Sequence, residues 1–93
     1  MRIFQAKSFE KKVKNMSKSE KDALDLEIKL IAEDSNLGEG KKGDLKDVFV
    51  HKFKLNTTQY LLAYRKVGGD LELVTIGPNE NYYRDLKQYL KNR

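Results

Sequence analysis

The clearest pattern in the chain is an alternation of apolar and basic residues over positions 47–55, which read DVFVHKFKL. Successive side chains of a β-strand point to opposite faces of the sheet. The alternation therefore predicts a strand with Phe49 and Phe53 facing a core and Lys52 and Lys54 facing the other way. Two neighbouring cations on one face of a sheet favour a polyanion as ligand.

Two further strands are predicted after this one. Residues 59–65 (QYLLAYR) are almost all apolar, which is typical of a strand in the middle of a sheet. Residues 71–76 (LELVTI) form the last strand. Turn residues at 56–58 and 68–70 separate the neighbours and predict an antiparallel meander. A short first strand is expected over 2–6.

Two helices are predicted in the N-terminal half. Ser8 is a candidate cap for the first, in which Phe9, Val13 and Met16 share one face. Residues 17–20 (SKSE) have the capping-box pattern and open a second, longer helix. Its apolar positions are expected to form one stripe and are Ala23, Leu24, Leu26, Ile28, Leu30 and Ile31.

A third helix is predicted near the C-terminus. Residues 77–87 read GPNENYYRDLK, in which Gly-Pro ends the last strand and an asparagine caps the helix. Residues 38–47, rich in glycine and charge, are expected to be a connecting loop, because their glycine spacing matches no phosphate-binding motif. The order β-α-α-β-β-β-α predicts a single α+β domain, 1–93, with the first two helices packed on one face of an antiparallel sheet.

The net charge of +5 is unevenly distributed along the 93 residues. Residues 1–40 carry eight Lys/Arg and eight Asp/Glu, whereas residues 41–93 carry eleven and six. This asymmetry favours a one-sided basic surface. The chain has no cysteine, which is typical of the reducing cytoplasm. No long apolar run predicts a membrane span, and the start has no signal-peptide pattern.

The candidate chemistry is that of cations and tyrosines. With one histidine and no cysteine, a Cys-His pair and a multi-histidine metal site are excluded, and no metal or cofactor is expected. The candidate residues are Lys46, His51, Lys52, Lys54, Arg65, Tyr82, Tyr83 and Arg84. Lysine and arginine hold phosphates and stabilise developing negative charge, and tyrosine stacks on a splayed base or donates a proton. The set favours RNA as substrate and a metal-free ribonuclease as activity.

Several candidates also have a structural interpretation. His51 falls on the same side of its strand as the aromatic residues, which favours a core position over a site position. Lys52 and Lys54 also fit an exposed edge strand, where lysine prevents unwanted pairing. Tyr83 has core spacing in its helix, and Arg65 fits the end of a hairpin.

In this order the features resemble the toxins of the RelE/ParE superfamily, from bacterial type II toxin–antitoxin systems. The resemblance covers the whole chain. It rests on the two-helix start, KKGDL before the basic strand, YLLAY at 60–64, and an Ile-Gly strand end followed by two tyrosines. One branch carries a GPHENFYRDLK-type segment, which here has Asn79 for the histidine and Tyr82 for the phenylalanine.

The resemblance implies a microbial RNase-like α+β fold and a monomeric toxin held by a cognate antitoxin in a hetero-oligomeric complex. RelE-type members cut mRNA in the ribosomal decoding site without a metal, whereas ParE-type members inhibit DNA gyrase. By position, Lys52 and Lys54 match the basic residues that act as base and phosphate ligands, and Tyr82 or Tyr83 matches the tyrosine that stacks on the nucleotide. Leu61 stands where the family has a strand arginine.

Two toxin activities therefore stay open, together with a third possibility in which the protein is not toxic. In the nuclease interpretation the catalytic residues are Lys52, Lys54, Arg65 and Tyr82, and the substrate-binding residues are Lys46, His51, Tyr83 and Arg84. In the gyrase interpretation the basic C-terminal helix makes the contacts and the protein performs no chemistry. The third possibility is a nucleic-acid-binding domain that has lost toxicity.

Overall fold

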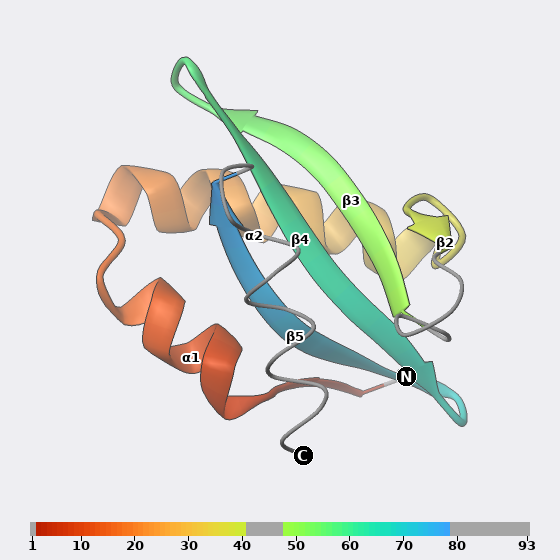
Figure 1. Ribbon diagram of the computed structural model, residues 1–93. Coiled ribbons are helices and arrows are strands. Elements are labelled where there is room, and N and C mark those ends of the chain that lie inside the picture. The colour runs from red at the N-terminus through yellow and green to blue at the C-terminus, as the bar shows by residue number, and fades with distance from the viewer. Residues whose placement is uncertain (1, 41–47, 79–93) are drawn as a thin grey trace.

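The computed structural model describes residues 2–40 and 48–78, which form a five-stranded sheet with two helices (Figure 1). The elements are β1 (Ile3–Gln5), α1 (Lys7–Lys14), α2 (Lys18–Glu33), β2 (Glu39–Gly40), β3 (Val48–Leu55), β4 (Thr58–Val67) and β5 (Asp70–Pro78). The strand order across the sheet is β1-β5-β4-β3-β2. The predicted α+β architecture is confirmed, while the predicted C-terminal helix lies outside the described residues.

The last three strands form the predicted antiparallel meander with β4 at its centre. Asn56, with φ 58°, supports the two-residue turn between Leu55 and Thr58. Gly68, with φ 62°, does the same between β4 and β5, where a left-handed residue is needed and glycine adopts it without strain. Residues 61–64 of β4 are all buried, as expected of a central strand.

The sheet is mixed, whereas the sequence predicted an antiparallel one. β1 pairs in parallel with β5, with Ile3 opposite Leu71 and Gln5 opposite Leu73. The two helices lie between β1 and the meander in the chain, so β1 joins the edge that β5 leaves free. The predicted loop over 38–47 is also shorter at its start, because Glu39–Gly40 pairs with β3.

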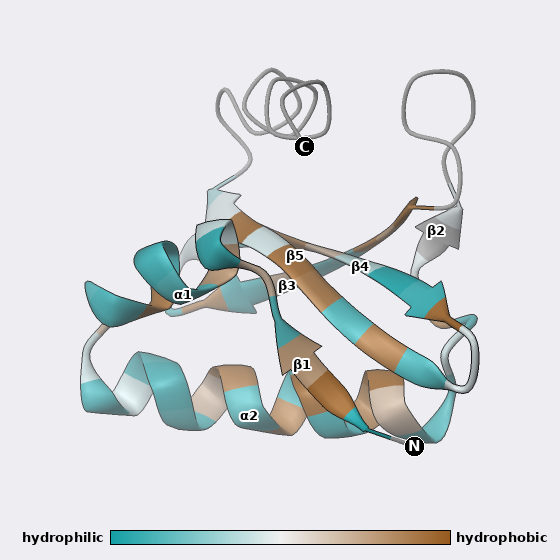
Figure 2. Ribbon diagram, turned by 90° about the horizontal axis from the view of Figure 1, so that it is seen from below, coloured by the Kyte–Doolittle hydropathy of each residue, from teal (hydrophilic) through white to brown (hydrophobic). Residues whose placement is uncertain are grey.

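The two helices pack against the sheet in different places. α2 crosses one face of the sheet and α1 lies alongside β5, so that the views in Figures 1 and 2 both separate the two helices. The core cluster between helices and sheet contains Phe9, Leu24, Ile31, Leu62, Tyr64, Leu71, Leu73 and Ile76. Burying each side chain of this size contributes about 1.5–3 kcal/mol.

The helix starts agree with the sequence in one case and differ in the other. At α2 the capping box is confirmed, with Glu20 N donating to Ser17 Oγ and Ser17 N to Glu20 Oε1. At α1 the predicted cap is wrong, because the helix begins at Lys7 and Ser8 instead bonds Thr75 of β5, with 2.8 Å between the hydroxyl oxygens. That bond holds α1 against the sheet.

The predicted single apolar stripe on α2 is wrong in part. Leu24 and Ile31 are buried, but Leu26 and Leu30 are 62% and 47% exposed. Each residue turns the helix by about 100°, so these two leucines lie on a different side of α2 from the core pair. No helix within the described residues has the length and apolar content to cross a bilayer.

β5 contains an irregularity that decides which of its residues reach the core. Its register against β4 shifts between Ala63 and Tyr64, which pair with Thr75 and Leu73 respectively. The extra residue, Val74, resets the alternation of the strand. As a result Leu73 and Ile76, three residues apart, both belong to the core cluster.

The segment after α2 is fastened to the sheet through the buried Tyr64. Its hydroxyl donates to the carbonyl oxygen of Ser35 at 2.9 Å and accepts from Gly38 N at 2.8 Å. A Cβ at Gly38 would lie 2.9 Å from the Tyr64 ring, so only glycine fits this approach. Burial raises the pKa of the Tyr64 hydroxyl, partly opposed by the bond from Gly38.

β1 is attached to β5 in part through Asp70. The backbone N–H of Arg2 donates to Asp70 Oδ1 at 2.9 Å, and this bond holds the pKa of Asp70 below its usual range. A lowered folded-state pKa contributes stability that is present above the unfolded value, about 3.9, and is lost as the pH falls through the folded value.

We therefore expect Asp70→Asn to destabilise the protein at neutral pH and to lose its effect in acid. The asparagine keeps an oxygen for Arg2 N but removes the charge. Thermal unfolding of both proteins across a pH series provides the measurement. The difference between them should shrink toward zero below about pH 4. A difference that stays constant at all pH values would contradict this role for the Asp70 carboxylate.

Candidate functional site

The candidate site lies on the face of the sheet that α2 does not cover, and β3 positions it. The strand pairs in register with β4, with Lys52 opposite Leu61 and Phe53 opposite Tyr60. Phe53 and Tyr60 pack against the core cluster under α2. Because neighbouring residues of a strand alternate, Lys52 and Lys54 lie on the other face, where both are exposed as predicted.

The two lysines are close enough to act on one ligand group. Residues two apart on a strand are separated by about 7 Å, and both side chains can turn toward a ligand placed between them. Lys52 stands beside Leu61, which is fully buried, and Lys54 beside Gln59, which is exposed. The pair therefore combines two exposed cations with a buried apolar residue on the neighbouring strand.

Arg65 shares this face but lies farther along the sheet. It pairs in register with Val48, four residues from Lys52, which corresponds to about 13 Å. Its guanidinium Nη1 lies 3.6 Å from Glu72 Oε1 on β5, and the carboxylate is the more buried partner. The sequence did not point to Glu72 as this partner, since it stands in an otherwise apolar strand. Arg65 is thus a cation held by a carboxylate, within the strand rather than at the hairpin end.

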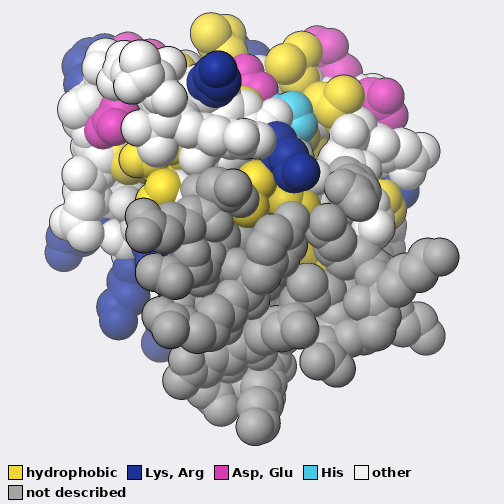
Figure 3. Space-filling view, turned by 45° about the horizontal axis from the view of Figure 1, so that its top comes forward, with side chains coloured by type: hydrophobic (Ala, Val, Ile, Leu, Met, Phe, Trp, Pro, Cys, Tyr) yellow, Lys and Arg dark blue, Asp and Glu magenta, His cyan; other side chains and the backbone are white. Residues whose placement is uncertain are grey.

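His51 lies on the opposite face from the lysines. Its Nε2 is 2.7 Å from Glu27 Oε1 of α2, and its ring stacks on Phe53 with centroids 5.7 Å apart. Figure 3 shows the imidazole, in cyan, beside apolar side chains in yellow and a Lys or Arg side chain in dark blue. The structure therefore separates His51 from the lysine pair, as the strand alternation indicated, and gives it a contact that packs β3 on α2.

Four predicted site residues have no described position. Lys46, Tyr82, Tyr83 and Arg84 lie outside the described residues, so their roles stay predictions. The described part of the site comprises Lys52, Lys54 and Arg65 on one face of the β3–β4–β5 sheet.

Comparison with solved structures identifies the fold as that of RelE toxins. A chain of the intact E. coli RelBE toxin–antitoxin complex matches with a TM-score of 0.67 and 16% identity, over 85% of this chain and 96% of that one. The isolated E. coli RelE toxin matches with a TM-score of 0.64 and 16% identity, over 94% and 96%. No curated protein matches the chain in sequence.

A family model, described as the ParE-like toxin of type II bacterial toxin–antitoxin systems, matches residues 3–87. The chain belongs to this family. The resemblance to the RelE/ParE superfamily that the motifs indicated is thereby confirmed, and the protein is a toxin of a type II toxin–antitoxin system.

The contact between His51 and Glu27 is expected to stabilise the packing of β3 on α2. We predict a coupling free energy of about 1–2 kcal/mol between the two side chains, because both are mostly buried and the acceptor is a carboxylate. Urea unfolding of Glu27→Ala, His51→Ala and the double variant measures it. Additive effects of the two single substitutions would show that the contact contributes nothing.

Proposed function

We propose that this toxin cleaves mRNA on the ribosome without a metal and is neutralised by a cognate antitoxin. The observation that carries the proposal is the exposed pair Lys52 and Lys54 on the sheet face opposite α2. The RelE fold and the family support it. The antitoxin is supported by the type II system to which the family belongs and by the similar chain that comes from a toxin–antitoxin complex.

The proposed reaction is an internal transfer of the phosphodiester. The 2′-oxygen of the ribose attacks phosphorus as its proton leaves, and the bond from phosphorus to the 5′-oxygen breaks as that oxygen takes up a proton. The products are a 2′,3′-cyclic phosphate and a free 5′-hydroxyl. One lysine of the pair assists removal of the 2′-proton, and the other stabilises the negative charge that grows on the phosphate oxygens.

The remaining predicted residues have supporting roles in this proposal. Arg65, about 13 Å along the sheet and paired with Glu72, suits a neighbouring phosphate better than the scissile one. Tyr82 stacks on the exposed base, as the resemblance implies, and Lys46 contacts the phosphate backbone. His51 has no part in the chemistry, because its face is packed against α2.

Inhibition of DNA gyrase is the second candidate, and two observations favour it. The matching family model is described as ParE-like. Leu61, where the resemblance implies an arginine, is the register partner of Lys52 and is fully buried, so it supplies no cation beside the lysine pair. In this candidate the protein binds its target and performs no chemistry.

Expression of Lys52→Ala/Lys54→Ala separates the two candidates. Loss of transition-state charge stabilisation typically costs a hundredfold or more, about 10²–10³, so growth arrest and cut mRNA ends should both disappear. Lys18→Ala/Lys21→Ala removes the same charge from the exposed side of α2 and should leave both intact. Primer extension on a reporter mRNA locates the cuts.

Two outcomes would contradict the nuclease. Cut mRNA that persists in the Lys52/Lys54 double variant would show that these lysines are not the catalytic groups. Altered plasmid supercoiling with intact mRNA on expression of the unsubstituted toxin would favour gyrase as the target. Soluble accumulation of each variant at the level of the unsubstituted protein shows that folding is retained.

A further inference from the structure

α1 is the most basic helix among the described residues, although the N-terminal half as a whole is neutral. Over Lys7–Lys14 it carries four lysines and one glutamate. α2, over Lys18–Glu33, carries three lysines and five acidic residues. The even count over residues 1–40 thus conceals a separation of charge between two helices that lie apart in the fold (Figure 2).

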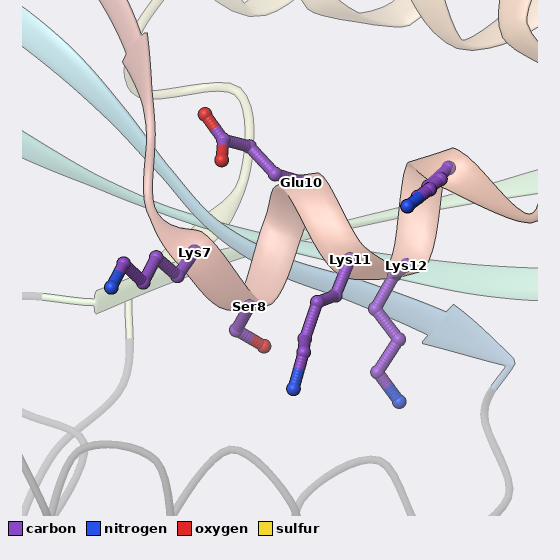
Figure 4. Close-up of a pocket in the computed structure, with 6 residues that line it drawn as sticks. Lys7, Ser8, Glu10, Lys11 and Lys12 are labelled. Atoms are coloured by element: carbon purple, nitrogen blue, oxygen red, sulfur yellow. The ribbon is translucent and has the colours of Figure 1, made fainter.

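The lysines of α1 gather around one hollow. It has a volume of about 590 Å³, and its described lining residues are Lys7, Ser8, Glu10, Lys11, Lys12 and Lys14. Figure 4 shows Lys11 and Lys12 extending toward the same side, Lys7 extending sideways from the start of the helix, and Glu10 pointing the opposite way from Lys11 and Lys12. All four lysines are exposed. α1 is fixed in this orientation because Phe9 is buried on its inner side and Ser8 bonds Thr75.

The α1 lysines lie at the end of the sheet that carries the β3 lysines. Lys12 also lines a second hollow, of about 280 Å³, together with Tyr60 and Pro78. Tyr60 and Pro78 are register partners, and the adjacent row of the sheet runs from Lys52 through Leu61 to Gly77. Since neighbouring rows of a sheet point to opposite faces, Tyr60 lies on the helix side and Lys52 on the other side. The α1 lysines therefore form a basic surface separate from that of the β3 lysines.

Stabilisation of the helix does not explain all of these lysines. Cations near a helix C-terminus interact favourably with the helix dipole, which accounts for the three lysines of the last turn. Lys7 is the first residue of α1, where the dipole disfavours a positive charge. The helix dipole therefore does not account for the cation at that position.

The surroundings favour a nucleic acid over a protein as the ligand. Protein interfaces have apolar or aromatic residues at their centre. Among the described residues the large exposed apolar side chains are Ile3, Phe4, Leu26, Leu30, Leu37 and Val67, none of which is on α1. Phosphate backbones, in contrast, are held by lysines that need no apolar neighbours.

We propose that the lysine face of α1, defined as Lys7, Lys11, Lys12 and Lys14, binds RNA phosphates. It is an anchoring surface distinct from the β3 lysines and makes no contact with the scissile bond. The inference rests on the proposed function only in taking RNA as the ligand.

The test compares two triple variants that remove equal charge. Lys7→Gln/Lys11→Gln/Lys12→Gln changes the α1 face, and Lys18→Gln/Lys21→Gln/Lys29→Gln changes the exposed side of α2. Glutamine has nearly the helix propensity of lysine. Affinity is measured over a salt series with a short single-stranded RNA carrying 2′-O-methyl riboses, which cannot undergo the internal transfer.

The α1 variant should bind about tenfold more weakly at low salt, and its salt slope should fall by about 2, since each single-strand phosphate contact contributes about 0.7. The α2 variant should bind as the unsubstituted protein does. The single variant Lys7→Gln should lower the slope by about 0.7 without loss of thermal stability, because it removes a charge that the helix dipole disfavours.

Equal weakening by both triple variants would overturn the proposal, since net charge alone would then explain binding. A salt slope that is unchanged in the α1 variants would also overturn it. So would α1 variants that still bind RNA but no longer bind the antitoxin, because α1 would then be a protein interface. The assay needs neither ribosome nor cleavage. If the α1 variants lower the salt slope as expected while the unsubstituted toxin cuts no mRNA, this inference stands and the nuclease proposal fails.

Discussion

The two-sided packing of β3 is the constraint on which the candidate site depends. On one side its aromatic residues form a layer with β4, in which Phe49 stacks on Tyr64 and Phe53 lies against Tyr60, with centroids 5.5 and 6.3 Å apart. His51 completes the layer through its contact with α2. A slip of one residue would move this layer to the opposite face and turn the lysines toward α2. The energy that packs β3 on α2 thus also directs its two lysines to the opposite face.

The two faces of the sheet and the two helices differ in charge and in what they contribute to the protein. α2 covers the aromatic layer and has an acidic balance, so it serves stability more than polyanion binding. The opposite face presents two exposed lysines, with Arg65 farther along and held by Glu72. α1 adds cations beyond β5, where its position is fixed by packing and by the Ser8–Thr75 bond. Positive charge is thus supplied by two elements that are far apart in the sequence.

Patterns of local spacing predicted most of the fold, because they report which side of an element is buried. The capping box at Ser17, the meander and the outward direction of Lys52 all follow from such spacing. Contacts between residues that are distant in the sequence produce no recognisable local sequence pattern. The carboxylates that hold His51 and Arg65, the parallel pairing of β1, and the bulge at Val74 each depend on an element elsewhere in the chain. The position of α1 beside β5 is of the same kind, which is why its lysines did not stand out in a neutral half.

The most direct test asks which face of β3 meets RNA. A photoreactive amino acid is placed at position 54 in one protein and at position 53 in another, and each is irradiated with ribosomes programmed with labelled mRNA. Lys54 and Phe53 are adjacent in β3, so their backbone positions are close, but their side chains point to opposite faces of the sheet. Adducts on mRNA should form from position 54 and not from position 53. Equal adducts from both positions, or adducts from position 53 alone, would contradict the assignment of the site to the face opposite α2.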